Sequence, residues 1–283
     1  MAYILKGTPE CVKSELKLFH LPPTQTAVEN GQWIEFHSLS NVFDGGPLNF
    51  IFSGDEYLDL IQTLLYVQAK ILKADGSSIL KEIKTGDNDS PETQIGPVNL
   101  FLHSLFSQVD VSLNDRLVSN SSNTYPYRSF IETLLNHCFD NKTSQLTSEM
   151  FYKDSDNGLE KRSKFFKSSA TVDMIGGLHS DLFYQERLLL NLVDLKIKLI
   201  RSKPEFCLQG EEGHKVVLEK ISLFVRKVRV SPGVILGHVN ALEKETTKYP
   251  INGVLCKVYS VPQGNMPIIQ DNISLDRCQK ELL

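Results

Sequence analysis

The sequence predicts an all-β fold, an antiparallel β-sandwich with inserted helices. One observation is a hairpin, because apolar and polar residues alternate over 109–113 and an Asn-Asp pair at 114–115 marks a tight turn. A second observation is the same alternation sustained over 193–199. A third is a set of short apolar segments bounded by turn residues, such as the Asp-Gly-Gly-Pro run at 44–47. Each alternating strand has one face toward a core and one toward water.

The first elements follow in order from the N-terminus. Residues 1–31 are expected to be an arm, because the Pro-Pro pair at 22–23 favours extended backbone and no hydrophobic periodicity persists. This arm either lies along a neighbouring subunit or is a disordered end. The polar run at 85–92 predicts an exposed loop. Strands are expected at 33–36, 48–52 and 63–73.

A helix of about three turns is expected after the hairpin, from about Tyr127 to Phe139. Its apolar residues recur at i, i+4, i+7 and i+11, which places them in one stripe along a helix. The stripe, which we expect to face the sandwich, consists of Tyr127, Ile131, Leu134 and Cys138. On that expectation, Leu134→Ala lowers the free energy of unfolding by about 2–5 kcal/mol.

The C-terminal part of the chain continues the β pattern. A strand is expected at 193–201, and its core-facing residues are Val193, Leu195, Ile197 and Leu199. Ser231 followed by a proline predicts the start of a helix that runs to about Lys248. Further strands are expected at 221–230 and 254–259. A second module of the same kind is therefore expected to begin near residue 205.

Long, ordered phrases of the chain also resemble one known family. They are GPVNLFLHSLFSQVDVSLNDRLVS (96–119), NTYPYRSFIETLL (123–135), CVKSELKLFHLPPTQTAVENGQWIEF (11–36), LHSDLFYQERLLLNLVDLKIKLIRS (178–202), LFVRKVRVSP (223–232) and KYPINGVLCKVYSVPQGN (248–265). The chain resembles the major capsid protein, of the double jelly-roll type, of Polinton/Maverick-like mobile elements and related viruses. The resemblance implies a shell protein with two tandem jelly rolls per subunit, whose trimers have a pseudo-hexagonal outline and tile an icosahedral shell.

The resemblance also implies a division into domains. These are an N-terminal arm (1–31), a first jelly-roll domain (32–203) and a partial second jelly-roll domain (204–283). The last segment is about half as long as an eight-stranded jelly roll with its loops. Residues 276–283 depart from the family, so the chain is interpreted as a C-terminally truncated copy. Without a covering sheet, an open apolar face is expected in this half, formed by Leu223, Val225, Val254 and Val258.

No catalytic, cofactor-binding or metal-ligating residue is assigned from the sequence, and no cofactor is expected. The sharpest enzymatic candidate is the H-x-D motif of His179 and Asp181. With a later histidine, either His214 or His238, it would form the facial triad that holds Fe(II) in oxygenases. A chain with 7 histidines readily produces so short a motif by chance. His103 is interpreted as a partly buried structural histidine.

Charge and hydrophobicity argue against nucleic acids and membranes as partners. The formal net charge of −4 argues against a nucleic-acid coat, so no sequence-specific nucleic acid is expected. The basic run at 161–167 is interleaved with phenylalanines, and we interpret it as a solvated loop in preference to a nucleic-acid contact. No apolar stretch approaches the length of a membrane span and no signal peptide is evident, so membrane insertion is not expected. The expected location is the virion, or the cytoplasm or nucleus of the host cell.

We therefore expect a structural capsid protein and not an enzyme, which self-assembles into trimers and an icosahedral shell. Its partners would be further copies of itself and other capsid proteins, such as a penton protein. Two alternatives stay open at this point. One is a jelly-roll Fe(II)-dependent oxygenase that uses His179 and Asp181. The other is a β-sandwich binding module adopted by the host.

Overall fold

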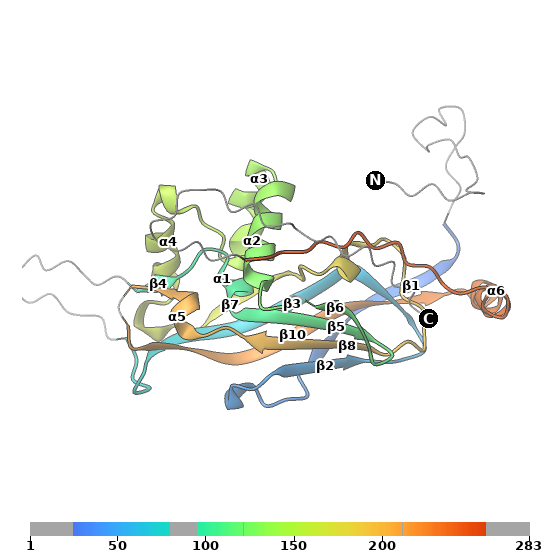
Figure 1. The fold of residues 1–283 in the computed structure, drawn as a ribbon, viewed down its shortest axis with the longest axis horizontal. Coiled ribbons are helices and arrows are strands. Elements are labelled where there is room, and N and C mark those ends of the chain that lie inside the picture. Colours follow the sequence, from blue (N-terminus) through green and yellow to red (C-terminus); the bar gives the residue numbers. More distant parts are fainter. Residues whose placement is uncertain (1–24, 80–94, 121, 211, 259–283) are drawn as a thin grey trace, which may run out of the picture.

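A computed structural model describes residues 25–79, 95–120, 122–210 and 212–258. In this part of the chain, two four-stranded antiparallel sheets face one another across an apolar core (Figure 1). The expected loop at 85–92, nearly all of the expected arm and the C-terminal residues after Val258 lie outside the described residues. No helix among the described residues is long and apolar enough to cross a membrane.

The eight strands of the two sheets have a rolled-hairpin order. The first sheet contains, in spatial order, β1 (Val28–His37), β10 (His214–Val230), β3 (Tyr57–Lys73) and β7 (Val172–Gly177). The second contains β2 (Leu48–Phe52), β8 (Leu195–Arg201), β5 (Phe106–Leu113) and β6 (Arg116–Asn120). Along the chain, the first of these strands pairs with the eighth, the second with the seventh, the third with the sixth and the fourth with the fifth. This is the order of an antiparallel jelly roll.

The predicted register of β8 is confirmed. Leu195, Ile197 and Leu199 are buried, whereas Lys198 is exposed. The strand begins two residues later than predicted, and Val193, which precedes it, is partly buried against the core. The same alternation holds in β3, and it puts the side chains of both sheets into one continuous core. The predicted hairpin is also confirmed, because β5 and β6 pair through a turn in which Asn114 (φ 46°) and Asp115 (φ 64°) both have positive φ.

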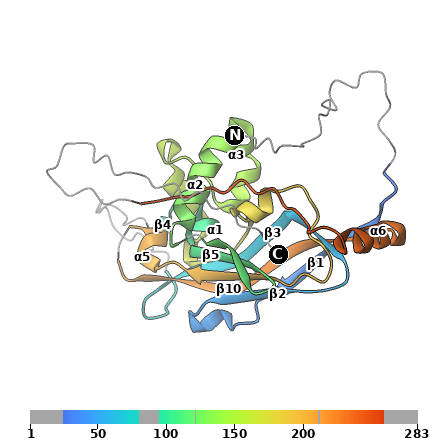
Figure 2. The same ribbon diagram turned by 45° about the vertical axis from the view of Figure 1, so that its right-hand side comes forward.

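Helices occupy the connections between strands. A large insertion between β6 and β7 contains α2 (Tyr125–Asn136), α3 (Phe139–Thr143), η3 (Gln145–Glu149), η4 (Asp154–Asp156), α4 (Gly158–Phe165) and η5 (Lys167–Ser169). The remaining short elements are η2 (Val42–Asp44), β4 (Gly96–Pro97), α1 (Phe101–Ser104), η6 (Asp181–Tyr184), α5 (Pro204–Cys207), β9 (Leu208–Gln209) and α6 (Pro232–Leu242). Figures 1 and 2 show α2, α3 and α4 grouped on one side of the sandwich and α6 at the opposite end.

β10 changes the expected organisation of the C-terminal part. It pairs with β1 on one side and with β3 on the other, so it is the eighth strand of this jelly roll. The expected boundary after residue 203 therefore falls inside the sandwich. Leu223 and Val225, expected on an open face, are both fully buried in the core. Alternation along the sequence shows that a strand has a buried face, but not which sheet it joins.

The expected strand at 254–259 is not formed in its described part. Residues 251–258 have no regular secondary structure, and Val254 and Val258 are exposed. A strand needs a neighbour with which to exchange backbone hydrogen bonds, and this segment pairs with no strand among the described residues. After β10, the described chain therefore consists of α6 and an extended segment to residue 258.

Candidate functional site

A cluster of buried polar side chains lies beneath α2, where the insertion meets the sandwich. Three of its members are largely inaccessible to solvent, because His103 is 0% exposed, Glu149 7% and His179 7%. They come from α1, from η3 and from the segment that follows β7. The buried polar cluster, as we call it, consists of His103, Tyr125, Arg128, Glu132, Glu149, His179 and Asp181, with Tyr184 at its edge, where it is 49% exposed.

The first part of the cluster is centred on His103. Its Nε2 lies 3.2 Å from Glu149 Oε2, and its Nδ1 lies 2.9 Å from the hydroxyl of Tyr125. Burial alone would raise the pKa of Glu149, but the hydrogen bond and the charge of His103 outweigh burial and lower this pKa. Close packing against β7 requires a glycine, since a Cβ at Gly176 would lie 2.3 Å from Glu149 Oε1. Glu149 is thus held as a carboxylate against the end of the sheet.

The second part of the cluster is centred on His179. Its Nδ1 lies 2.8 Å from Glu132 Oε2 of α2, and the Tyr184 hydroxyl donates to the same carboxylate oxygen at 3.0 Å. Burial lowers the pKa of His179 more than the hydrogen bond to Glu132 raises it. The ring of His179 is perpendicular to the ring of His103, with 4.6 Å between the centroids. The two imidazoles are therefore neighbours, although they are 76 positions apart in the chain (179 − 103).

The third part of the cluster joins α2 to the H-x-D segment through an arginine. Arg128 is 6% exposed, and its Nε donates to Glu132 Oε1 at 2.8 Å. Its terminal nitrogen donates to Asp181, which also accepts from the backbone N–H of Val254 at 3.2 Å. The cluster consequently connects α2, η6 and the extended segment after α6.

The structure does not assemble the facial triad that was considered as an alternative. His179 is directed to Glu132, whereas Asp181 is paired with Arg128. His238 lies on α6, and its Nδ1 forms a hydrogen bond with the hydroxyl of Tyr57 at 2.8 Å. His214 is the first residue of β10. Among the described residues, the set able to share a metal ion with His179 is instead His103 and Glu149.

Sequence reasoning missed the two glutamates of the cluster. Glu149 lies on a short 3-10 helix without periodicity, so no pattern distinguishes it from a surface residue. A signal for Glu132 existed, because Arg128 and Glu132 are one turn apart on the polar face of α2. His103, expected to be partly buried, is fully buried and hydrogen-bonded through both ring nitrogens.

The apolar stripe predicted for this helix faces outward, so its expected orientation is wrong. α2 buries polar residues, including Arg128, Ser129 and Thr133, because these lie over the cluster and the core beneath it. The α2 apolar face, as we call it, consists of Tyr127, Ile131, Leu134 and Leu135 of α2 together with Phe139, the first residue of α3. The exposed fractions of these side chains lie between 43% and 78%. Cys138, also expected to face the sandwich, is exposed. Helical periodicity identified the stripe but could not tell core from exterior.

This orientation changes the expected effect of truncating Leu134. Because the side chain is 43% exposed, Leu134→Ala should lower the free energy of unfolding by about 1 kcal/mol or less. Leu199→Ala, at a core position of β8, is the matched control and should lower it by about 2–5 kcal/mol. Urea unfolding followed by circular dichroism measures both. Equal losses for the two variants would show that Leu134 is buried after all.

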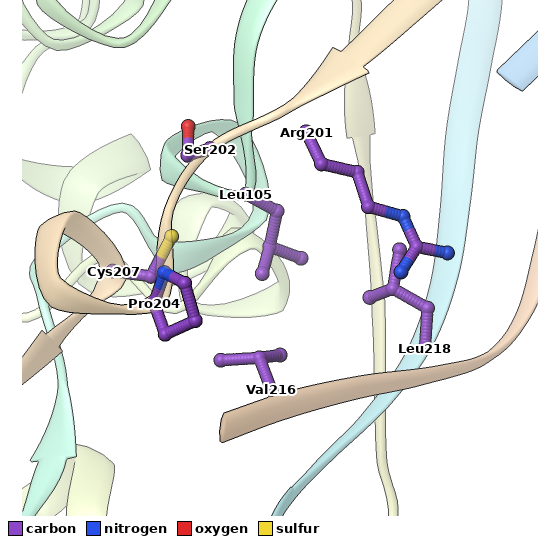
Figure 3. A pocket seen from close by; sticks show the side chains of 7 residues that line it. All are labelled: Leu105, Arg201, Ser202, Pro204, Cys207, Val216 and Leu218. Atoms are coloured by element: carbon purple, nitrogen blue, oxygen red, sulfur yellow. The ribbon is translucent and has the colours of Figure 1, made fainter. Parts of the chain in front are cut away.

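A small hollow lies at the junction of α5 with the sandwich (Figure 3). Its volume is about 30 Å³, which accommodates a water molecule but not an organic ligand. Figure 3 shows Arg201 on one side of the hollow and Cys207 on the other. Burial raises the pKa of the Cys207 thiol to about 12, so this cysteine is protonated and unreactive at neutral pH. The hollow offers no substrate site.

Comparisons with known proteins give distant similarities. No family model matches the chain. An uncharacterized protein of Caenorhabditis elegans is 23% identical over 227 residues, which cover 76% of this chain and 52% of that protein. Among solved structures, the Sputnik virophage structure gives a TM-score of 0.48 at 12% identity, covering 82% of this chain and 54% of that chain.

Two further structural similarities are to major capsid proteins. The mavirus major capsid protein gives a TM-score of 0.45 at 12% identity, covering 83% of this chain and 54% of that chain. The Faustovirus major capsid protein gives 0.43 at 9% identity, covering 81% and 59%. The chain therefore spans about half the length of the proteins it matches. The pairing of the strands defines the jelly roll independently of these similarities.

Proposed function

We propose that this chain is a structural building block of a viral-type shell, which acts by self-assembly and not by catalysis. The observation that carries the proposal is the α2 apolar face, which an otherwise well-packed jelly roll presents to its surroundings. Contiguous exposed apolar side chains mark a surface that contacts a partner. The sequence resemblance to major capsid proteins of Polinton/Maverick-like elements supports the same function.

The proposed partner of the α2 apolar face is a second copy of this chain. Three copies related by a threefold axis can each place this face against a different surface of the next copy and close a ring. A pseudo-hexagonal outline needs two jelly rolls per subunit, and the described residues supply one. We therefore expect the chain alone to form trimers or other small oligomers without closing a shell. In the virion, the further partners would be other capsid proteins such as a penton protein.

The test measures the oligomeric state as a function of concentration. We expect the chain to associate, because burial of the α2 apolar face removes apolar surface from water. Leu135→Glu should raise the dissociation constant about tenfold or more, since this leucine is 78% exposed and is the most exposed residue of the face. Size-exclusion chromatography with light scattering, together with sedimentation, measures the association.

Leu39→Glu is the matched control, because Leu39 is 69% exposed and lies between β1 and β2, outside the α2 apolar face. It should leave the dissociation constant unchanged. A chain that stays monomeric at all concentrations would contradict the proposal and favour the host-adopted binding module. The Fe(II) oxygenase is not proposed, because His179, Asp181 and His238 contact Glu132, Arg128 and Tyr57 respectively and not one another.

A further inference from the structure

Three potential metal ligands of the buried polar cluster come from three separate segments and converge. His103, Glu149 and His179 each offer one ligand atom, and these atoms all lie within 4.8 Å of one another. All three side chains are buried, so a bound ion would be shielded from water. Two imidazoles and one carboxylate are a ligand set that binds Zn²⁺ and related divalent ions.

The surroundings of the two histidines are those of metal ligands. A ligating histidine uses one ring nitrogen for the ion and donates the other N–H to an oxygen that fixes the ring. The Nδ1 of His179 lies 2.8 Å from Glu132, and the Nδ1 of His103 lies 2.9 Å from the Tyr125 hydroxyl. In both residues an ion would then bind at Nε2, and in His103 it would replace the present hydrogen bond between Nε2 and Glu149 Oε2 at 3.2 Å. The oxygen partners of both histidines are thus already in place, both supplied by α2.

The excess of negative charge in the cluster also favours the binding of a cation. It contains three carboxylates, those of Glu132, Glu149 and Asp181, and one guanidinium, that of Arg128. Arg128 is paired with Glu132 and Asp181, whereas Glu149 is paired with His103. Metal ligation requires neutral imidazoles, and in that state the net charge of the cluster is −2 (+1 − 3), which is unfavourable at a largely buried site. One divalent cation at Glu149 balances it.

We propose that His103, Glu149 and His179 bind a divalent transition-metal ion, of which Zn²⁺ is the type. The ion joins α1, η3 and the segment after β7, so it fastens the helical insertion to the sandwich. Three protein ligands leave the fourth position of a tetrahedral ion to a water molecule, and the ion would stabilise the fold by holding three separate segments together. The inference stands on the cluster alone and does not depend on assembly through the α2 apolar face.

The test is a titration of metal-free full-length protein with Zn²⁺ and with Co²⁺. We expect binding of about one ion per chain and a higher melting temperature in the presence of Zn²⁺. The d–d absorption of bound Co²⁺ reports nitrogen and oxygen ligation directly. Glu149→Gln keeps the shape of the side chain but removes the anionic ligand, and it should abolish Co²⁺ binding.

Two further variants separate metal binding from a fold defect. Glu132→Gln leaves all three ligands in place and should weaken Zn²⁺ binding about 10- to 100-fold through His179. His37→Gln, at an exposed histidine of β1, is the matched control and should bind like the unmodified protein. Folded metal-free protein that binds neither Zn²⁺ nor Co²⁺ overturns the proposal. So does Glu149→Gln protein that binds Co²⁺ as tightly as the unmodified chain, and the cluster is then balanced by protons on its histidines.

Discussion

Arg162→Met is expected to lower the free energy of unfolding by about 3–5 kcal/mol, because it leaves buried hydrogen-bond acceptors without a donor. Arg162 is fully buried, and its Nε donates to the carbonyl of Pro97 at 2.8 Å. A second nitrogen donates to the carbonyl of Tyr152 at 2.7 Å, and a third pairs with Asp154 at 2.6 Å. Since Asp154 is 59% exposed, the two carbonyls and not the ion pair account for most of the loss.

Chemical unfolding followed by far-ultraviolet circular dichroism measures this effect. Lys161→Met is the matched control, because Lys161 is the preceding residue of the same helix and is exposed. It should change the free energy of unfolding by no more than about 0.5 kcal/mol. If both variants lose the same small amount, Arg162 belongs to the solvated basic loop expected from the sequence, and its burial is refuted.

Arg128→Met is the second substitution with a large expected effect, again about 3–5 kcal/mol of unfolding free energy. The change keeps an apolar stem of similar length but removes the guanidinium between two carboxylates. Glu132 and Asp181, whose side chains are 11% and 16% exposed, would then face one another without a cation. Repulsion between them should loosen α2 from η6.

A double-mutant cycle gives the sharper measurement. Asp181→Asn in the Arg128→Met background removes one of the two repelling charges and should recover part of the lost stability. The control is Arg229→Met, at an exposed position of β10, which should have little effect. Strictly additive losses in the cycle would show that Arg128 and Asp181 do not interact, contrary to the structure.

Strand registers could be predicted from the sequence where one face is apolar and the other polar. In β8, lysines alternate with Leu195, Ile197 and Leu199, and a shift by one residue would bury the lysines, so one register is strongly favoured. The β5–β6 hairpin was predictable because Asn114 and Asp115 tolerate the positive φ that its turn requires. Both elements depend on local chemistry, which a single sequence contains in full.

The sheet to which β10 belongs was not predictable in this way. Its partner β1 begins at Val28, which pairs with Val230, a residue near the other end of the described sequence. Nothing in local alternation encodes so distant a neighbour. The orientation of α2 failed for a related reason. Its polar face packs on the buried polar cluster, where Glu132 contacts His179, and this contact is a product of the tertiary fold.

The candidate site was therefore predictable only in part. The sequence drew attention to His179, but the short motif that did so paired it with Asp181, which contacts Arg128 instead. Its neighbours in space, His103 and Glu149, are 76 and 30 positions away (179 − 103 and 179 − 149). Buried sites of this kind are assembled by the topology, and short motifs do not reveal them.

The position of β10 has a consequence for the making of the protein. This strand lies between β1 and β3 in the finished sheet but is the last of the eight strands to be synthesised. Until β10 has been synthesised, β1 and β3 each have an unpaired edge. These edges can form hydrogen bonds with other nascent chains on the same messenger RNA. The pairing of β1 with β10 also closes a loop of nearly the whole jelly roll, so this folding step is slow. A nascent chain halted before residue 214 should therefore depend on chaperones, and release from that dependence should coincide with the emergence of Val230 from the ribosome.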